Sequence, residues 1–236
     1  KAAVEESLGT SEIEGEFLNV DAVRSSAARR LGVEIGADLL QDRSVDGVVE
    51  MVFDATANYR QPLTKERIMG WHAGLFPTGY SGITQISVGE WRNDLRGEMR
   101  IVSGELGREL VHYEAPPAVR IEAEMAHFLN WVNNDSNIDP IIKVGRAHLW
   151  FEVIHPFDDG NGRVSRLLAN LVLTREGMPP LILRHKGDRE RYINALAFSD
   201  EGGDISRLIL VFCRSIERVI EEMSDPQTAQ EYFDAD

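Results

Sequence analysis

Residues 155–166 read HPFDDGNGRVSR, and this stretch decides how the rest of the chain is interpreted. Pro156 predicts that a helix over 140–154 ends just before it, because proline disfavours helical geometry in the residue that precedes it. His155 would then lie at the C-terminal edge of that helix, where it can face a cleft. The glycines on either side of Asn161 permit backbone angles that other residues avoid, and an apolar helical pattern follows at once. The stretch therefore predicts a glycine loop that leads into a second helix.

Such a loop is a candidate anion-binding site. Unpaired N–H groups and the positive end of the helix dipole meet in the first turn of a helix, and phosphate is their usual ligand. Arg163 and Arg166 lie three residues apart, so their guanidinium groups project from the same helix face. The carboxylate of Asp159 is a hard oxygen ligand that suits Mg²⁺ shared with the phosphates of a nucleotide. His155 then remains as the candidate general base.

Each of these features also has a simpler interpretation. A Gly-Asn-Gly turn beside aspartate is common simply as a turn, and basic residues near a helix start are often solvated. His155 could cap its helix. His148 and His155, seven residues apart, could be metal ligands, but no third residue follows at a zinc-like spacing. The sequence contains neither G-x-x-x-x-G-K-[ST] nor G-x-G-x-x-G, so no other nucleotide-binding motif competes.

The composition is that of a soluble globular protein of one domain or two small ones. Of its 236 residues 43% are hydrophobic and 27% charged, which excludes collagen-like, low-complexity and disordered classes. Acidic residues outnumber basic ones 39 to 25, and the net charge of −14 argues against binding nucleic acid or an anionic membrane surface. The single cysteine, Cys213, excludes an internal disulfide and suits a reducing compartment. With no membrane span and no signal-peptide pattern, we expect a cytoplasmic protein.

Hydrophobic periodicity predicts a mainly α fold. Helices are expected over about 5–18, 20–31, 44–59, 64–75, 118–133, 140–154, 162–176, 188–200 and 204–223. Between them, frequent glycines and lost helical periodicity over 79–118 favour loops, with a β-hairpin at 99–113. We expect an N-terminal helical region (1–59), a core domain (60–223) and an acidic tail (224–236).

The stretch 155–166 resembles the signature of the Fic family, HPF-x-[DE]-GNGR-x-x-R, at all nine specified positions. The resemblance covers roughly residues 60–220, from before the hairpin through the helices that flank the motif. Members of this family are mostly helical and transfer AMP from ATP to protein hydroxyls. The resemblance therefore implies a Fic fold, in which a helical core carries a small β-hairpin flap beside the active site.

The resemblance implies a role for each residue of the loop. His155 would take the proton from the hydroxyl of a target Ser, Thr or Tyr, and Asp159 would hold Mg²⁺. Asn161 and the N–H groups around Gly160 and Gly162 would cradle the α-phosphate.

The outer phosphates would be held by Arg163 and Arg166. This division of roles agrees with the chemistry, because positioning and electrostatics dominate transfer at phosphorus.

The resemblance also implies a docking flap and a contact for the nucleotide base. The hairpin would bind a target segment as an added strand. Its candidate docking residues are Ile101, Val102, Val111 and His112. Where the family often carries a Tyr-Tyr pair and a later Asn near the base, this chain has Tyr192-Ile193 and Asp200. ATP is therefore the expected donor, with Tyr192 in the nucleotide site, and another nucleotide stays possible.

Residues 10–15, TSEIEG, resemble the inhibitory motif [ST]-x-x-x-E-[GN] of Fic proteins whose inhibitory helix precedes the core. The resemblance implies that Glu14 pairs with Arg166 and blocks productive seating of the γ-phosphate. The alternative is that Ser11 and Glu14 form a capping box at the start of a helix.

Taken together, the residues and the resemblance predict an autoinhibited protein adenylyltransferase that uses Mg-ATP and a protein target, with a homo-oligomer possible. Four alternatives stay open: transfer of another nucleotide, kinase activity, hydrolytic removal of AMP with Glu14 positioning water, and a binding module without catalysis. The intact Gly-Asn-Gly-Arg sequence argues against the kinase variant, and the complete motif argues against lost catalysis.

Overall fold

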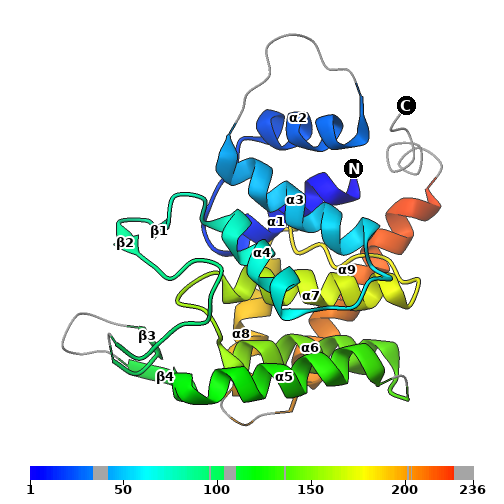
Figure 1. The fold of residues 1–236 in the computed structure, drawn as a ribbon. Coiled ribbons are helices and arrows are strands. Elements are labelled where there is room, and N and C mark those ends of the chain that lie inside the picture. Colours follow the sequence, from blue (N-terminus) through cyan, green and yellow to red (C-terminus); the bar gives the residue numbers. More distant parts are fainter. Residues whose placement is uncertain are drawn as a thin grey trace.

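The computed structural model describes residues 1–33, 42–95, 97–103, 110–135, 137–200, 202 and 204–225. Most of these residues are helical (Figure 1). The helices are α1 (Ala2–Ile13), α2 (Val20–Leu31), α3 (Arg43–Ala57), α4 (Lys65–Leu75), α5 (Ala118–Asn134), α6 (Pro140–Ile154), α7 (Asn161–Arg175), α8 (Asp188–Asp200) and α9 (Ser206–Ser224). Two antiparallel strand pairs are β1 (Tyr80–Ser81) with β2 (Thr84–Gln85), and β3 (Arg100–Ser103) with β4 (Leu110–Glu114). The mainly α fold is confirmed.

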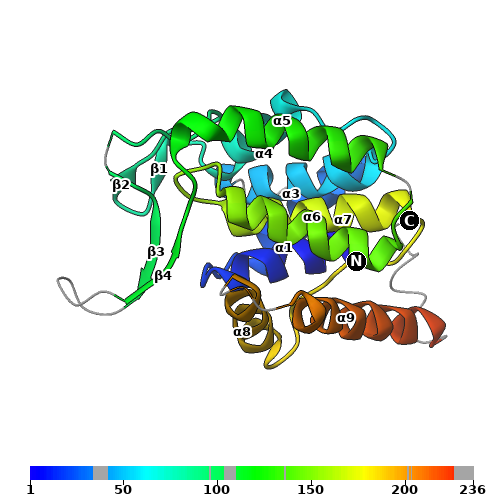
Figure 2. The ribbon, with the colours of Figure 1, turned by 90° about the horizontal axis from the view of Figure 1, so that it is seen from below.

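Helix α7 forms the centre of the molecule. It packs against α1, α3, α4 and α6, and its side chains from Val164 to Leu173 are all buried. A helix that is buried all round needs few polar residues on any face, which explains its run of leucine, valine and alanine. Both views show the two hairpins on the side of the molecule where α7 begins (Figures 1 and 2). The sequence motif at the start of α7 therefore faces the hairpins.

Most helix ends follow the expected local signals. The Asn19 side chain accepts hydrogen bonds from the first turn of α2, and α2 ends at Gly32, whose φ is 72°. Asp139 caps α6 in the same way, ahead of Pro140. The ranges predicted for α2, α6 and α8 are the observed ones.

The N-terminal helix ends earlier than expected. We predicted a helix to about residue 18, but α1 ends at Ile13 because the chain turns at Gly15, whose φ is 81°. Glu14 is consequently the C-terminal cap residue of α1. Ser11 and Glu14 lie at the end of the helix and not at its start, so the capping-box interpretation is wrong.

The predicted hairpin at 99–113 is confirmed in outline as β3 and β4. Val102 lies opposite Val111, and an irregularity in the pairing follows Ile101. The backbone of His112 also lies in β4. The side chains of 101–112 and the loop 104–109 lie outside the described residues, as does the tail from 226.

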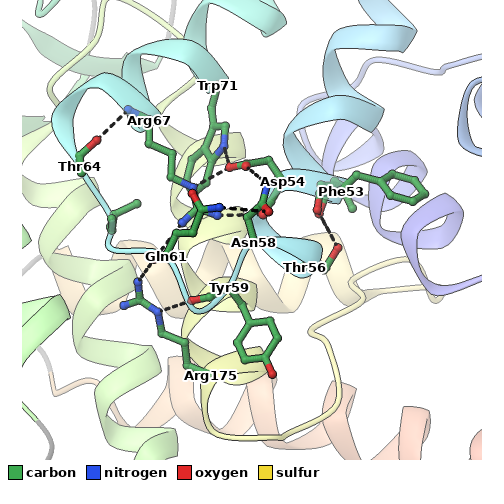
Figure 3. Close-up of polar contacts among 12 residues, drawn as sticks. Phe53, Asp54, Thr56, Asn58, Tyr59, Gln61, Thr64, Arg67, Trp71 and Arg175 are labelled. Carbon is green, nitrogen blue, oxygen red and sulfur yellow. Dashed lines mark hydrogen bonds and ion pairs between the residues drawn. The ribbon is translucent and has the colours of Figure 1, made fainter. Parts of the chain in front are cut away.

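A polar network ties the corner between α3 and α4 to the far end of α7 (Figure 3). Asp54 accepts hydrogen bonds from Arg67 Nε at 2.6 Å and Trp71 Nε1 at 2.8 Å. Arg175, in the last turn of α7, donates to the backbone oxygen of Tyr59 at 2.9 Å and to that of Gln61 at 2.9 Å. These contacts hold α7 at the end opposite the motif.

Across the ranges given above, none of the helices combines the length and the apolar character needed to cross a membrane.

Candidate active site

The loop between α6 and α7 is fixed by the side chain of Asn161. Its Oδ1 accepts from the N–H of Phe157 at 3.0 Å, and its Nδ2 donates to the oxygen of Phe157 at 2.8 Å. Asn161 is buried, and both ends of its amide are therefore used by the loop backbone. Its contribution to a phosphate site is to shape the loop, since its side chain is already engaged.

Gly160 begins α7 in a conformation that favours glycine. Its φ is 81°, and an added Cβ would lie 2.8 Å from a ring carbon of Phe76. The left-handed turn starts α7 directly after the loop, so the N–H groups of its first turn lie beside the loop, as in a helix N-terminal anion site.

The carboxylate of Asp159 lies beside this turn. Its Oδ1 accepts from the N–H of Gly160 at 2.5 Å, and its Oδ2 accepts from the hydroxyl of Ser81 in β1. The backbone oxygen of Asp159 lies 3.1 Å from Nε2 of His72, whose ring stacks on Phe157. Burial lowers the pKa of His72 to about 4, so this ring is neutral and its Nε2–H donates to Asp159. Sequence patterns do not reveal Ser81 or His72, because their contacts join residues far apart in the chain.

His155 ends α6 with φ of 49° and ψ of 59°, in the left-handed region. Its Nδ1 lies 3.3 Å from the backbone oxygen of Glu152, so Nδ1 carries the proton and Nε2 has a free lone pair. Burial lowers the pKa of His155 to about 4, and the positive charge of Arg92 acts in the same direction. The imidazole is therefore neutral at physiological pH and able to accept a proton at Nε2.

Arg166 is held by the end of α1. Its Nη2 lies 2.6 Å from Glu14 Oε1 and 2.9 Å from the backbone oxygen of Thr10, and its Nε donates to Thr10 Oγ1 at 3.0 Å. Burial opposes the charged guanidinium, but the charges of and hydrogen bonds with Glu14 and Tyr192 together outweigh burial and raise the pKa of Arg166 above its usual range. The predicted pairing of Glu14 with Arg166 is present in the structure.

Arg163 is engaged by the segment that follows α1. Its Nη1 lies 2.7 Å from Glu16 Oε2, and its guanidinium lies over the ring of Phe76. The buried Nε of Arg163 has no hydrogen-bond partner within the part of the chain that the structure describes. The Arg163 guanidinium therefore has a donor that Glu16 does not use.

Tyr192 lies beneath Arg166. It is only 1% exposed, and its hydroxyl lies 3.0 Å from His148 Nε2 and 3.4 Å from Arg166 Nη1. In this structure Tyr192 contacts Arg166 and His148, and its expected contact with the nucleotide stays a prediction.

Residues 62–173 match the model of the Fic/DOC family. The chain carries a Fic/DOC domain over these residues. Residues 1–33, which contain α1, match a second family described as a domain of unknown function, DUF4172.

Curated Fic relatives match the central part of the chain. A probable protein adenylyltransferase from Aquifex aeolicus is 36% identical over 120 residues, covering 51% of this chain and 35% of its own. The protein adenylyltransferase Fic of Aedes aegypti is 36% identical over 126 residues, covering 51% of this chain and 25% of its own. The match thus spans about a third or less of these relatives.

Solved structures share the fold over a larger part of the chain. A Fic family protein from Desulfovibrio desulfuricans has a TM-score of 0.66 at 24% identity, covering 97% of this chain and 68% of its own. A Fic domain protein from Bacteroides thetaiotaomicron has a TM-score of 0.67 at 23% identity, covering 93% and 84%. The Fic fold is therefore confirmed.

Proposed function

We propose that this protein is an adenylyltransferase that transfers AMP from Mg-ATP to a Ser, Thr or Tyr hydroxyl of a target protein. The observation that carries the proposal is the loop 155–163, which combines a neutral histidine, a glycine turn at a helix N-terminus and a buried arginine with an unused N–H. The names of the curated relatives support the same activity.

The proposed reaction is an in-line displacement at the α-phosphorus. The hydroxyl oxygen of the target forms a bond to the α-phosphorus as the bond to the bridging oxygen of the β-phosphate breaks, and pyrophosphate leaves. Nε2 of His155 accepts the hydroxyl proton. The N–H groups at the start of α7 and the guanidinium groups of Arg163 and Arg166 stabilise the negative charge of the phosphates.

Asp159 is the residue we propose for Mg²⁺. No group of three or more His, Cys, Asp or Glu side chains that could hold a metal occurs among the residues with a described position. One carboxylate is nevertheless suitable, because Mg²⁺ is usually bound by one or two carboxylates together with substrate phosphates and water. When bound, Mg²⁺ would neutralise charge on the phosphates. The Ser81 hydroxyl now on Asp159 would then have to share or leave that oxygen.

We further propose that the observed conformation is inhibited. Glu14 and Glu16 occupy the arginines expected to bind the outer phosphates, with distances of 2.6 Å and 2.7 Å. ATP therefore has to displace one or both carboxylates before its phosphates can be aligned for transfer.

Hydrolytic removal of AMP is the second candidate, because the Glu14 carboxylate lies directly against Gly162. An added Cβ at Gly162 would be 2.5 Å from Glu14 Oε1. A carboxylate at this place could orient a water molecule toward an α-phosphate bound in the loop.

The test is to incubate the chain with Mg²⁺ and each labelled nucleoside triphosphate in turn, then to measure label and mass added to protein. If protein gains a nucleoside monophosphate only with ATP, the result supports adenylyl transfer. If it gains one with a different triphosphate, that triphosphate is the donor. Release of AMP from a modified protein, without transfer in the forward direction, supports the hydrolase. Nucleotide binding with neither reaction indicates a binding module.

A further inference from the structure

The backbone of His155 is in a conformation that needs support. Among the residues the structure describes, it is the one non-glycine residue with a positive φ. Such a conformation costs free energy and persists only where the surrounding contacts determine it. The ring of His155 can act as a base only if this backbone holds its direction, so the groups that fix it matter for catalysis.

Arg92 supplies the contacts that fix this segment. Its Nε donates to the backbone oxygen of His155 at 2.7 Å, and its own backbone N–H donates to the oxygen of Pro156 at 2.9 Å. The side chain of Arg92 is 1% exposed. Both carbonyl groups at the turn are therefore bound by one buried residue that lies far away in the sequence.

The other arms of the Arg92 guanidinium reach the base of the flap. Nη2 donates to the backbone oxygen of Pro116, just after β4, at 2.6 Å. Nη1 lies 3.1 Å from Asp94, whose second oxygen accepts from the N–H of Ala118 at the start of α5 at 2.7 Å. One planar group thus joins the turn at His155 to the end of the flap and the start of α5.

A second contact runs between the same two parts of the molecule. The hydroxyl of Tyr113 in β4 donates to the backbone oxygen of Val153 in the last turn of α6 at 2.6 Å. The flap is consequently attached to the helix that ends at His155 through two independent side chains.

We propose that Arg92 is a positioning residue that holds His155 in its left-handed conformation and links this conformation to the base of the flap. The proposal rests on the proposed function in taking His155 as the base. In the contacts described, Arg92 forms no hydrogen bond with the loop beyond Pro156 or with either motif arginine, so its loss should affect the chemical step more than nucleotide binding.

The charge of Arg92 provides a readout that does not depend on activity. The groups that act on the His155 ring are the Glu152 carbonyl, Arg92, Asp159 and Glu14, and among them Arg92 lowers the pKa. Removing its charge should therefore raise the pKa of His155, which NMR titration of the ring measures directly. A lysine at position 92 would keep the charge but lose the planar set of donors.

The experiment compares Arg92→Gln, Arg92→Lys and the matched control Arg120→Gln. Arg120 forms an ion pair with Glu124 on the exposed side of α5, so the control removes a guanidinium that lies on the surface. For Arg92→Gln we expect kcat for transfer to fall about 10- to 100-fold, because small misplacements of a catalytic group have effects of this size. We expect an unchanged Kd for ATP and a raised pKa of His155. Arg92→Lys should recover the pKa and only part of kcat, and the control should match the unsubstituted chain.

Several outcomes would overturn the proposal. They are an Arg92→Gln chain that transfers at the unsubstituted rate, one in which the His155 pKa is unmoved, or one that loses ATP binding in parallel with kcat. If Arg92→Gln does not fold, Arg92→Lys carries the test, and a kcat equal to that of the unsubstituted chain then refutes positioning. If no form of the chain transfers AMP, the proposed function fails. The NMR titration then still tests whether Arg92 acts on the ring of His155.

Discussion

Replacing Glu14 by glycine should activate the enzyme. The carboxylate of Glu14 lies 2.6 Å from Arg166, where its side chain is 37% exposed and that of Arg166 is 5% exposed. The pair is thus intermediate between an exposed ion pair, worth about 0–1 kcal/mol, and a buried charge-assisted hydrogen bond, worth about 1.5–3 kcal/mol. We take about 1–2 kcal/mol as the free energy that ATP must overcome to use Arg166, and this corresponds to about a 5- to 30-fold rise in kcat/KM.

The effect on stability should be small. Glu14 is the C-terminal cap residue of α1 and is followed by a turn at Gly15, so the new glycine does not interrupt the helix. The cost should fall below the roughly 1 kcal/mol of a glycine inside a helix. Activation with little change in Tm therefore separates release of Arg166 from a general loosening of α1.

The assay is the rate of self-modification with Mg-ATP, followed by intact-protein mass, beside a thermal melt. Glu14→Gln and Glu12→Gln form a matched pair, because each removes one ion pair between α1 and the core. Glu12 lies 3.2 Å from Arg184, which Glu5 also binds at 2.5 Å, so Glu12→Gln leaves Arg166 engaged. If Glu12→Gln activates as strongly as Glu14→Gln, or if Glu14→Gly only melts earlier, the inhibitory role of Glu14 is refuted.

Four further outcomes are expected. His155→Ala should abolish transfer and leave the Kd for ATP nearly unchanged, because a base acts on the barrier and not on phosphate binding; transfer at the original rate would remove His155 from this role. Asp159→Asn should weaken the dependence of the rate on Mg²⁺ concentration, and an identical Mg²⁺ titration would count against metal binding. Val111→Pro should reduce modification of another protein more than nucleotide binding, since proline cannot donate to an added strand; equal losses would argue against a docking flap. Burial raises the pKa of Glu6 from 4.5 to about 8, so the folded state binds the extra proton and stability falls as pH rises between these values. Glu6→Gln should remove this part of the pH dependence in melts from pH 5 to pH 8, and an unchanged pH profile would contradict the raised pKa.

Local signals explain which parts of the fold the sequence predicts. The range of α2 follows from Asn19 and Gly32, and that of α6 from Pro140 and Pro156, because caps and prolines act on the residues beside them. The apolar spacing predicts a longer α1 than the structure has, because it does not register the turn at Gly15, whose φ of 81° follows the end of the helix. The β1–β2 pair was missed because its strands have two residues each and carry no periodicity.

The candidate active site likewise contains some residues that the sequence predicts and others that only the folded structure shows. Residues of the motif were found because their spacing is set within one loop and one helix, and the pairing of Glu14 with Arg166 was implied by a second motif. Arg92 and His72 were missed, although each binds a backbone oxygen of the loop. Neither an arginine in a loop, such as Arg92, nor a single buried histidine in a helix, such as His72 in α4, has a sequence pattern of its own, and their partners are known only when the chain is folded.

The absence of a side chain at Gly162 has a consequence for how constitutive activity could arise by mutation. An added Cβ there would meet Glu14 Oε1 at 2.5 Å and Arg166 Nη1 at 3.1 Å. A larger residue would displace the Glu14 carboxylate, which we propose to be inhibitory, but it would also fill the space proposed for the α-phosphate and disturb Arg166. A substitution at Gly162, on α7, would therefore remove the Glu14 contact and impair catalysis at the same time. A genetic screen for hyperactive variants should recover changes at Glu14 and at Thr10, both at the end of α1, and none at Gly162.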